Sequence, residues 1–182
     1  MKITKTKFEG LIIIEPTVYG DERGYFFESY AQSALAAEGI DRTFVQDNEA
    51  MSTKGVLRGL HYQTNGMGQA KLVRVSQGEV LDVAVDIRPQ SATYGQHISV
   101  VLNDITKKQM LVPAGFAHGY IVLSDTAVFQ YKCDKPYSPA DEAGILYSDP
   151  ALAIDWILPA EVYTVSPKDT AQPLLADHKP YV

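Results

Sequence analysis

The chain has 182 residues, a length that suits one domain with a core large enough to fold without metals or disulfides. Hydrophobic residues make up 46% and charged residues 21%, which is ordinary for a globular protein. The formal net charge of -6 argues against nucleic acid as the main partner, because such binding surfaces need a basic excess. Cys133 is the only cysteine, and no apolar stretch is long enough to span a bilayer. We therefore expect a cytoplasmic protein that binds no membrane.

The first forty residues predict two short strands followed by one helix. The apolar run Leu11 to Ile14 ends at a Glu-Pro pair, and Gly24 to Glu28 follows a polar turn. A helix is expected from Tyr30 to Glu38, because Ser29 and Gln32 have the spacing of a capping box and a glycine follows the segment.

The middle of the chain predicts a series of strands. Leu81 to Ile87 alternates apolar with polar or small residues, a period of two that is typical of a half-buried strand. Lys71 to Val75 precedes it across a Ser-Gln-Gly turn, so the two are expected to form a hairpin. Further strands are expected at Phe44–Gln46, His97–Leu102, Gln109–Val112, Gly119–Leu123 and Ala127–Cys133.

These elements favour a mainly β fold. Eight or more short strands at close spacing are typical of an antiparallel sandwich or barrel, of which the jelly roll is one form. We expect one domain over residues 1–182, with a core barrel at about 40–135 and a few short helices. Residues 136–182 are rich in Pro, Asp and Ala and are expected to wrap this body. A barrel of this size can hold one small ligand inside.

The segment Gly55 to Gln63 carries the most chemical information. It places Arg58 and His61 in a stretch otherwise built like a buried strand, and Lys71 follows with the same parity as the apolar Val73. Each residue alone is also consistent with a structural or solvated role. Groups that are costly to bury persist in a core when they are paired or in use. A base and two cations suit an anionic substrate from which a proton must be removed.

Strict alternation puts Arg58 and His61 on opposite faces of one strand. A bulge at Gly59 would turn one of them, or the two side chains serve different parts of a complex. The sequence leaves both possibilities open.

A second motif lies at Pro113 to His118. Its Pro-x-Gly-x-x-His pattern, together with Gly55 and the five residues that separate it from His61, resembles the two motifs of cupins, jelly-roll proteins that often bind a transition metal. Gln63 replaces the second histidine of the first motif, and no acidic residue occurs between it and Glu79. Two histidines without a carboxylate are one ligand short of a usual site, so we expect no metal.

Tyr131 and Asp169 are the remaining candidates for chemistry. Tyr131 shares a strand face with Phe129 and Cys133, which is also what a core tyrosine would do. Its unperturbed pKa near 10 keeps the phenol protonated at neutral pH, so it could serve as a general acid. Asp169 lies in a Ser-Pro-Lys-Asp sequence that would ordinarily begin a helix or form a turn.

Taken together, these segments resemble the dTDP-4-dehydrorhamnose 3,5-epimerases, nearly from end to end. Fold alone never fixes function, so the resemblance depends on six stretches that occur in the family's order. They are Gly20–Glu28, Phe44–Asn48, Gly55–Gln63, Lys71–Val75, Pro113–His118 and Tyr131–Lys132.

The resemblance implies a specific chemistry. The substrate would be a 4-keto-6-deoxyhexose on dTDP, whose C3 and C5 hydrogens both flank the C4 ketone. His61 would be the general base and Asp169 its partner, in the way that an aspartate supports other catalytic histidines. Lys71 would stabilise the C4 oxyanion, and Tyr131 would deliver a proton from the opposite face. No metal or redox cofactor is required.

The resemblance also implies the binding residues and the assembly. The family is homodimeric, with N-terminal strands, here within residues 8–30, exchanged between subunits. The cationic side chains that bind the phosphates and the rest of the substrate would be Arg23, Arg58 and Lys168. Glu28, Gln46 and Asn48 would form hydrogen bonds with the base or the sugar. Tyr137 would stack on thymine, His118 would contact the sugar, and Glu142 would make a further contact with the substrate. Arg23 and Glu28 would reach the partner's site.

One departure and three alternatives remain. Thr64 to Ala70 replaces a loop that contains proline in many family members, which affects local loop shape. The nearest alternative is a related enzyme that epimerises only C3 or only C5, or a 3,4-ketoisomerase. A metal-dependent cupin enzyme and a non-catalytic sugar-nucleotide-binding module are more distant. The binding module would need no acid opposite the base.

Overall fold

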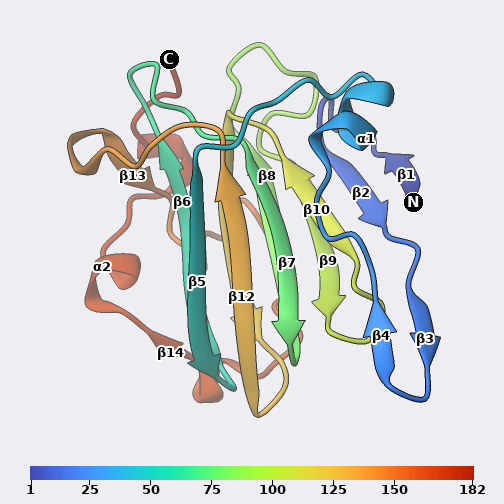
Figure 1. Cartoon of the computed structure of the whole chain (residues 1–182). Coiled ribbons are helices and arrows are strands. Elements are labelled where there is room, and N and C mark those ends of the chain that lie inside the picture. Colours follow the sequence, from blue (N-terminus) through green and yellow to red (C-terminus); the bar gives the residue numbers. More distant parts are fainter.

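The alternating apolar residues of the sequence form the facing sides of two sheets in the computed structural model, which describes all 182 residues (Figure 1). Neighbouring strands are antiparallel, except that β14 pairs with β6 in parallel. The first sheet has the order β1 (Lys2–Lys5), β2 (Ile12–Glu15), β10 (Gln109–Val112), β7 (Lys71–Gln77), β12 (Thr126–Cys133) and β5 (Gln46–Thr53). The second has the order β13 (Glu142–Gly144), β6 (Val56–Gln63), β11 (Phe116–Val122), β8 (Glu79–Asp86) and β9 (His97–Asn103), with β14 (Thr164–Val165) beside β6. The mainly β prediction is confirmed.

The expected hairpin between Lys71–Val75 and Leu81–Ile87 is wrong. Strand β7 pairs with β10 and β12, whereas β8 pairs with β11 and β9 in the other sheet. The chain therefore crosses between the sheets at Gly78. This glycine has a φ of +77°, and a Cβ there would lie 2.0 Å from the Thr126 carbonyl oxygen. A positive φ and close backbone contact make this a position for glycine and allow the sharp change of direction.

The prediction of a half-buried strand at Leu81 to Ile87 is also wrong in one respect, because β8 is buried on both faces. Its apolar face, which includes Leu81 and Val83, packs against the C-terminal segment. Its other face includes Asp82 and Ala84 and looks into the space between the sheets. The alternation is real, but its polar side faces an interior and not solvent.

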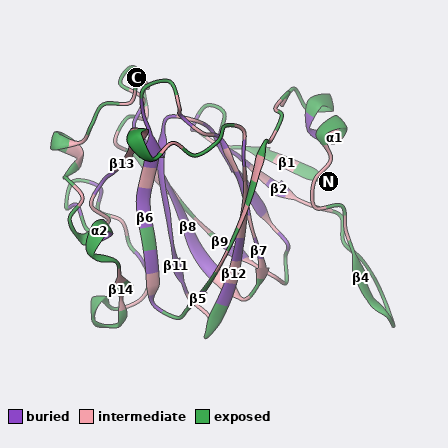
Figure 2. Cartoon of the chain, turned by 60° about the vertical axis from the view of Figure 1, so that its left-hand side comes forward, coloured by how far each residue is buried: buried purple, intermediate pink, exposed green.

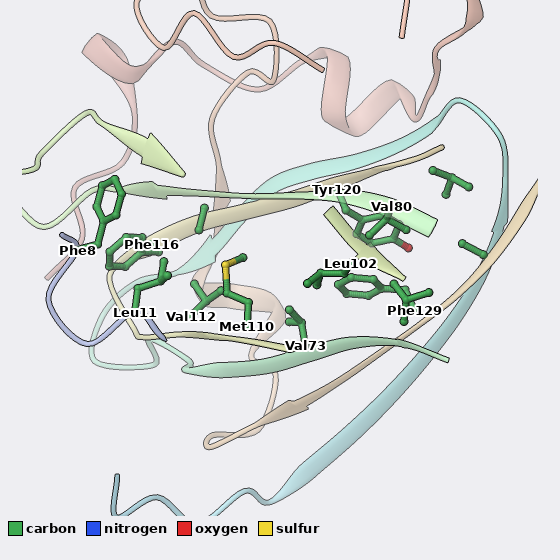
Figure 3. Packing of buried hydrophobic residues seen from close by; sticks show 14 residues of the cluster. Phe8, Leu11, Val73, Val80, Leu102, Met110, Val112, Phe116, Tyr120 and Phe129 are labelled. Carbon is green, nitrogen blue, oxygen red and sulfur yellow. The ribbon is translucent and has the colours of Figure 1, made fainter. Parts of the chain in front are cut away.

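Three apolar clusters hold the layers together. The largest lies between the two sheets and contains Val73, Met110, Tyr120 and Phe129 (Figure 3). A second cluster, around Trp156, joins the outside of the β6–β11–β8 sheet to the C-terminal residues. Figure 2 shows that α2 and β14 lie on the β6 side of the sandwich. The third lies on the outside of the other sheet. Burial of this apolar area stabilises the sandwich at about 25 cal/mol per Å².

The helices are few and short. Helix α1 spans Gln32–Ala37, inside the expected range, and ends before Gly39 with a φ of +80°. The expected capping box is absent: Ala31 is the N-cap residue and no side chain caps the helix. The backbone carbonyl of Ser29 instead accepts a hydrogen bond from the Gln109 side chain, which holds this residue outside the helix. The others are α2 (Pro167–Thr170) and the 3-10 turns η1 (Pro139–Asp141), η2 (Ala160–Val162) and η3 (Leu175–Asp177). None of these helices is long and apolar enough to cross a membrane.

A small hairpin projects from the body (Figures 1 and 2). It consists of β3 (Tyr19–Asp21) and β4 (Gly24–Phe26), so the expected strand at Gly24 to Glu28 ends two residues early. All six residues of the two strands are exposed. The hairpin therefore contributes little to the core of its own chain.

Candidate active site

A cavity of 590 Å³ lies between the two sheets and contains most of the residues that the sequence singled out. One wall comes from β6 and β11, the other from β7 and β12, and α2 closes one side. The predicted site residues on its lining are Arg58, His61, Lys71, His118, Tyr131, Lys168 and Asp169.

A bulge in β6 brings Arg58 and His61 to the same cavity. His118 pairs with His61, but Tyr120, two residues further along β11, pairs with Arg58. Three steps along β6 thus match two along β11, which reverses the parity and turns both side chains inward. The structure therefore has the bulge that alternation alone left open.

Gly59 makes the bulge sterically possible. Its φ is +135°, and a Cβ would lie 2.6 Å from the Cα of Gly119 on β11. Its backbone N–H donates to Asp169 Oδ2 at 3.4 Å. The bulged residue therefore connects β6 to the C-terminal segment that carries α2.

His61 and Asp169 form a closely bonded pair. His61 Nε2 lies 2.5 Å from Asp169 Oδ1, and the aspartate side chain is only 4% exposed. Burial raises the pKa of Asp169, but the hydrogen bond and charge of His61 outweigh it, so the pKa lies below its ordinary value. The Ser166 hydroxyl also accepts the Asp169 backbone N–H at 3.1 Å. Because Asp169 occupies Nε2, the free ring nitrogen of His61 is Nδ1.

Lys71 and Tyr131 lie on the wall opposite His61. They belong to the neighbouring strands β7 and β12, and the Lys71 Nζ lies 5.9 Å from the centre of the Tyr131 ring. Burial lowers the pKa of Lys71. Burial raises the pKa of Tyr131, which keeps its phenol protonated through neutral pH. A nitrogen base and a phenolic acid thus face a common space from two different sheets.

His118 is held by an aspartate that the sequence reasoning missed. Its Nε2 lies 2.9 Å from Asp82 Oδ1, and Asp82 is fully buried. Burial raises the pKa of Asp82, against the opposing effect of His118. The signal was present in the sequence, because Asp82 is an acidic residue in a strand of high apolar content, but it was assigned to the solvent face.

A polar rim lies next to the cavity. Lys168 Nζ lies 2.5 Å from Glu142 Oε2, and the Tyr137 hydroxyl donates to the same carboxylate oxygen at 2.8 Å. Gln46 donates to Asn48 at 3.0 Å, and its own oxygen accepts the Tyr137 backbone N–H. A smaller hollow of 280 Å³ is lined by the rim residues other than Lys168 and also by His61, Lys71 and Tyr131. The rim is therefore continuous with the site.

Arg23 and Glu28 are the two predicted residues that line neither hollow of their own chain. Arg23 lies at the hairpin turn with its side chain 85% exposed, paired to Asp21 at 2.5 Å. The structure contains no group of three or more His, Cys, Asp or Glu side chains arranged to hold a metal ion.

A jelly-roll sandwich with a His–Asp pair on one wall and a phenol and a lysine on the other is an arrangement that can move protons at a carbon centre. The family model of dTDP-4-dehydrorhamnose 3,5-epimerase matches residues 5–177, and the chain belongs to this family.

Curated relatives and solved structures agree with this assignment. The dTDP-4-dehydrorhamnose 3,5-epimerase of Salmonella typhimurium is 50% identical over 96% of both chains, and that of Escherichia coli is 48% identical over 93% of this chain and 91% of its own. The crystal structure of a dTDP-6-deoxy-D-glucose-3,5-epimerase from Legionella pneumophila, in complex with dTDP-4-keto-L-rhamnose, has a TM-score of 0.94 at 50% identity, over 100% of this chain and 98% of its own. The crystal structure of a 3'-monoepimerase from Streptomyces bikiniensis has a TM-score of 0.86 at 34% identity. The match covers 94% of this chain and 86% of that one.

Proposed function

We propose that the protein is a dTDP-4-dehydrorhamnose 3,5-epimerase, an isomerase that converts dTDP-4-dehydro-6-deoxy-D-glucose to dTDP-4-dehydro-L-rhamnose in dTDP-L-rhamnose biosynthesis. The observation that carries the proposal is the opposition of His61 and Tyr131 across one cavity. A base on one face of a ring carbon and an acid on the other invert that carbon. A base alone would exchange the proton and return it to the same face.

Proton removal begins at His61. Its Nδ1 takes the proton from the carbon next to the C4 ketone, and the electron pair moves onto the C4 oxygen as an enolate. Asp169, ionised because its pKa is lowered, stabilises the imidazolium that forms. Lys71 places its charge beside the C4 oxyanion, where fixed electrostatics contribute most.

Reprotonation comes from the other wall. Tyr131 gives its phenolic proton to the opposite face of the same carbon, which restores the ketone and inverts the centre. The phenolate then regains a proton from solvent as His61 loses one. A second cycle at the other carbon completes the change from the D-sugar to the L-sugar. Protons and electrons balance within these groups, so the reaction uses no cofactor.

The rim residues suit a nucleoside diphosphate. Arg58 and Lys168 would bind the diphosphate, and Arg58 makes no ion pair within the chain. Other contacts fit the polar character of their surroundings: Gln46, Asn48 and Glu142 to base or sugar, His118 to the sugar, and Tyr137, which is 48% exposed, stacked on thymine.

We also infer a homodimer in which the β3–β4 hairpin contacts a second copy. Tyr19, Tyr25 and Phe26 are 65%, 60% and 69% exposed, and large apolar groups gathered on a projecting hairpin are typical of an interaction surface. Exchange of this segment would also carry Arg23 and Glu28 to the partner's cavity. A cytoplasmic location fits the reduced Cys133 and the nucleotide-linked substrate.

The direct test is incubation of the 4-keto sugar nucleotide with the enzyme in deuterated water, followed by proton NMR. Deuterium at both C3 and C5 with formation of the L-sugar supports the proposal. Label at one carbon only would identify a single-centre epimerase, and no label would reject an epimerase of either kind. His61→Asn is the matched control, because it keeps a polar side chain at this position and removes the base.

A further inference from the structure

The guanidinium of Arg58 is held by a buried hydroxyl on the facing sheet. Arg58 Nε donates to the Ser52 Oγ at 3.2 Å. Ser52 lies near the end of β5 and is only 5% exposed, whereas Arg58 itself is exposed and makes no ion pair in the chain. The contact therefore joins an exposed, charged side chain to a buried residue of the facing sheet.

A second buried hydroxyl lies beside this contact. Tyr120 is 5% exposed, and its hydroxyl has no hydrogen-bond partner. Its ring is fixed by stacking on Phe129, with the ring centres 4.1 Å apart and the planes 16° from parallel (Figure 3). Tyr120 on β11 is the strand partner of Arg58 on β6, and both residues line the same cavity, so the phenol lies beside the guanidinium.

An unpartnered buried hydroxyl costs free energy, so its presence here needs a reason. Packing against Phe129 alone would be served as well by a phenylalanine. The corner made by Arg58, Ser52 and Tyr120 contains an excess of donors: Arg58 keeps four N–H groups after the bond to Ser52, and the two hydroxyls each carry a proton. Oxygens that only accept hydrogen bonds, such as those of a diphosphate, complement such a corner.

We propose that Ser52 is a positioning residue that holds the Arg58 guanidinium in the orientation required to bind the substrate's diphosphate, and that the free Tyr120 hydroxyl donates a hydrogen bond to the same diphosphate. This inference rests on the proposed function, and it adds two residues that do not carry charge. With Nε bonded to Ser52, both terminal nitrogens of Arg58 remain free of partners in the chain, and Arg58 and Tyr120 both line the cavity. The planar guanidinium can then bind two phosphate oxygens at once without first losing rotational freedom.

The test compares binding of dTDP with binding of thymidine, measured by isothermal titration calorimetry. Ser52→Ala should weaken dTDP binding about three- to tenfold, the range expected for one lost hydrogen bond, and leave thymidine binding unchanged. Ser52→Thr keeps the hydroxyl on a strand-compatible side chain and should restore dTDP affinity. Ser99→Ala, an exposed serine on β9, is the matched control and should have no effect.

Two further variants show whether the effect passes through Arg58. In an Arg58→Lys background, Ser52→Ala should cause no additional loss, because a lysine has no Nε–H to hold. Tyr120→Phe should weaken dTDP binding with an unchanged or higher melting temperature, since it removes an unpartnered buried oxygen.

The possible results separate the inference from the proposed function. Equal losses for dTDP and thymidine, additive losses in the Arg58→Lys background, or wild-type dTDP affinity in Ser52→Ala would each overturn the positioning role. A wild-type protein that binds thymidine but not dTDP, and causes no deuterium exchange, would instead count against the proposed function itself.

Discussion

The substitution Asp169→Asn tests the base in the most direct way. The Asp169 carboxylate contacts His61 Nε2 at 2.5 Å and is buried, so in the proposed mechanism it would stabilise the imidazolium that forms when a substrate proton is taken. Two unit charges about 4 Å apart interact by about 4 kcal/mol at an effective dielectric constant of about 20. At about 1.4 kcal/mol per factor of ten, this corresponds to a loss of roughly 10³ in kcat. The side chain of His61 is 28% exposed, and solvent screening reduces the expected loss to about 10²–10³.

Single-turnover deuterium incorporation at C3 and C5, followed by NMR, measures this loss without interference from product release. Affinity for dTDP and the melting temperature serve as controls, and we expect dTDP affinity to stay within about twofold because Asp169 pairs with His61, whereas Lys168 pairs with Glu142. A variant that exchanges protons within about threefold of the wild-type rate would refute the assignment of Asp169 as the partner of the base.

Four further outcomes are expected. Tyr131→Phe should abolish inversion but retain solvent exchange at C3, measured by the same NMR assay; inversion at the wild-type rate would require another acid. Burial lowers the pKa of Lys71 and raises that of Tyr131, so Lys71 should lose its charge first as pH rises. Activity should therefore fall with a midpoint below the ordinary lysine pKa of 10.5. Lys71→Arg should move this limb of the kcat–pH profile to higher pH. Gly59→Ala should lower the free energy of unfolding in urea by more than about 2 kcal/mol, since the new Cβ would lie 2.6 Å from the Gly119 backbone. Gly66→Ala, at a φ of +75° with open space around it, should cost only about 1 kcal/mol. Equal costs would contradict the close packing of the bulge. Phe26→Asp should shift the mass found by light scattering from two chains to one, and a persisting dimer would exclude the hairpin from the interface.

Local sequence patterns predicted strands best where tertiary contacts agree with them. The apolar alternation of Leu81 to Ile87 and the run Gln109 to Val112 both became strands at the expected places. Strand β5 was expected only at Phe44 to Gln46, yet it spans Gln46–Thr53, because its polar residues alternate between solvent and the substrate cavity. A strand that lines a polar cavity lacks the apolar face on which the pattern depends.

The partner of each strand could not be predicted from the same patterns. Short turns favour hairpins, but the chain turns at Gly78 into the opposite sheet, and this depends on contacts with Thr126 and Asp104 from distant parts of the chain. The same limit applies to Asp82, whose role follows from which sheet face looks inward. Residue types and motif order identified the candidate site, whereas pairing between distant strands set its geometry.

The bulge at Gly59 shows how one position links both halves of the site. Without it, strict alternation would turn either Arg58 or His61 away from the cavity, so the diphosphate cation and the base could not act on one substrate. The same residue presents its N–H to Asp169, which reaches it because β14 pairs with β6 and leads directly into α2. In the proposed mechanism, the C-terminal segment thus supplies the partner of the base and also covers the sheet. A substitution that loosens β14 should therefore reduce proton exchange before it unfolds the sandwich, since Asp169 would be displaced while the central cluster of Val73, Met110 and Phe129 stays packed.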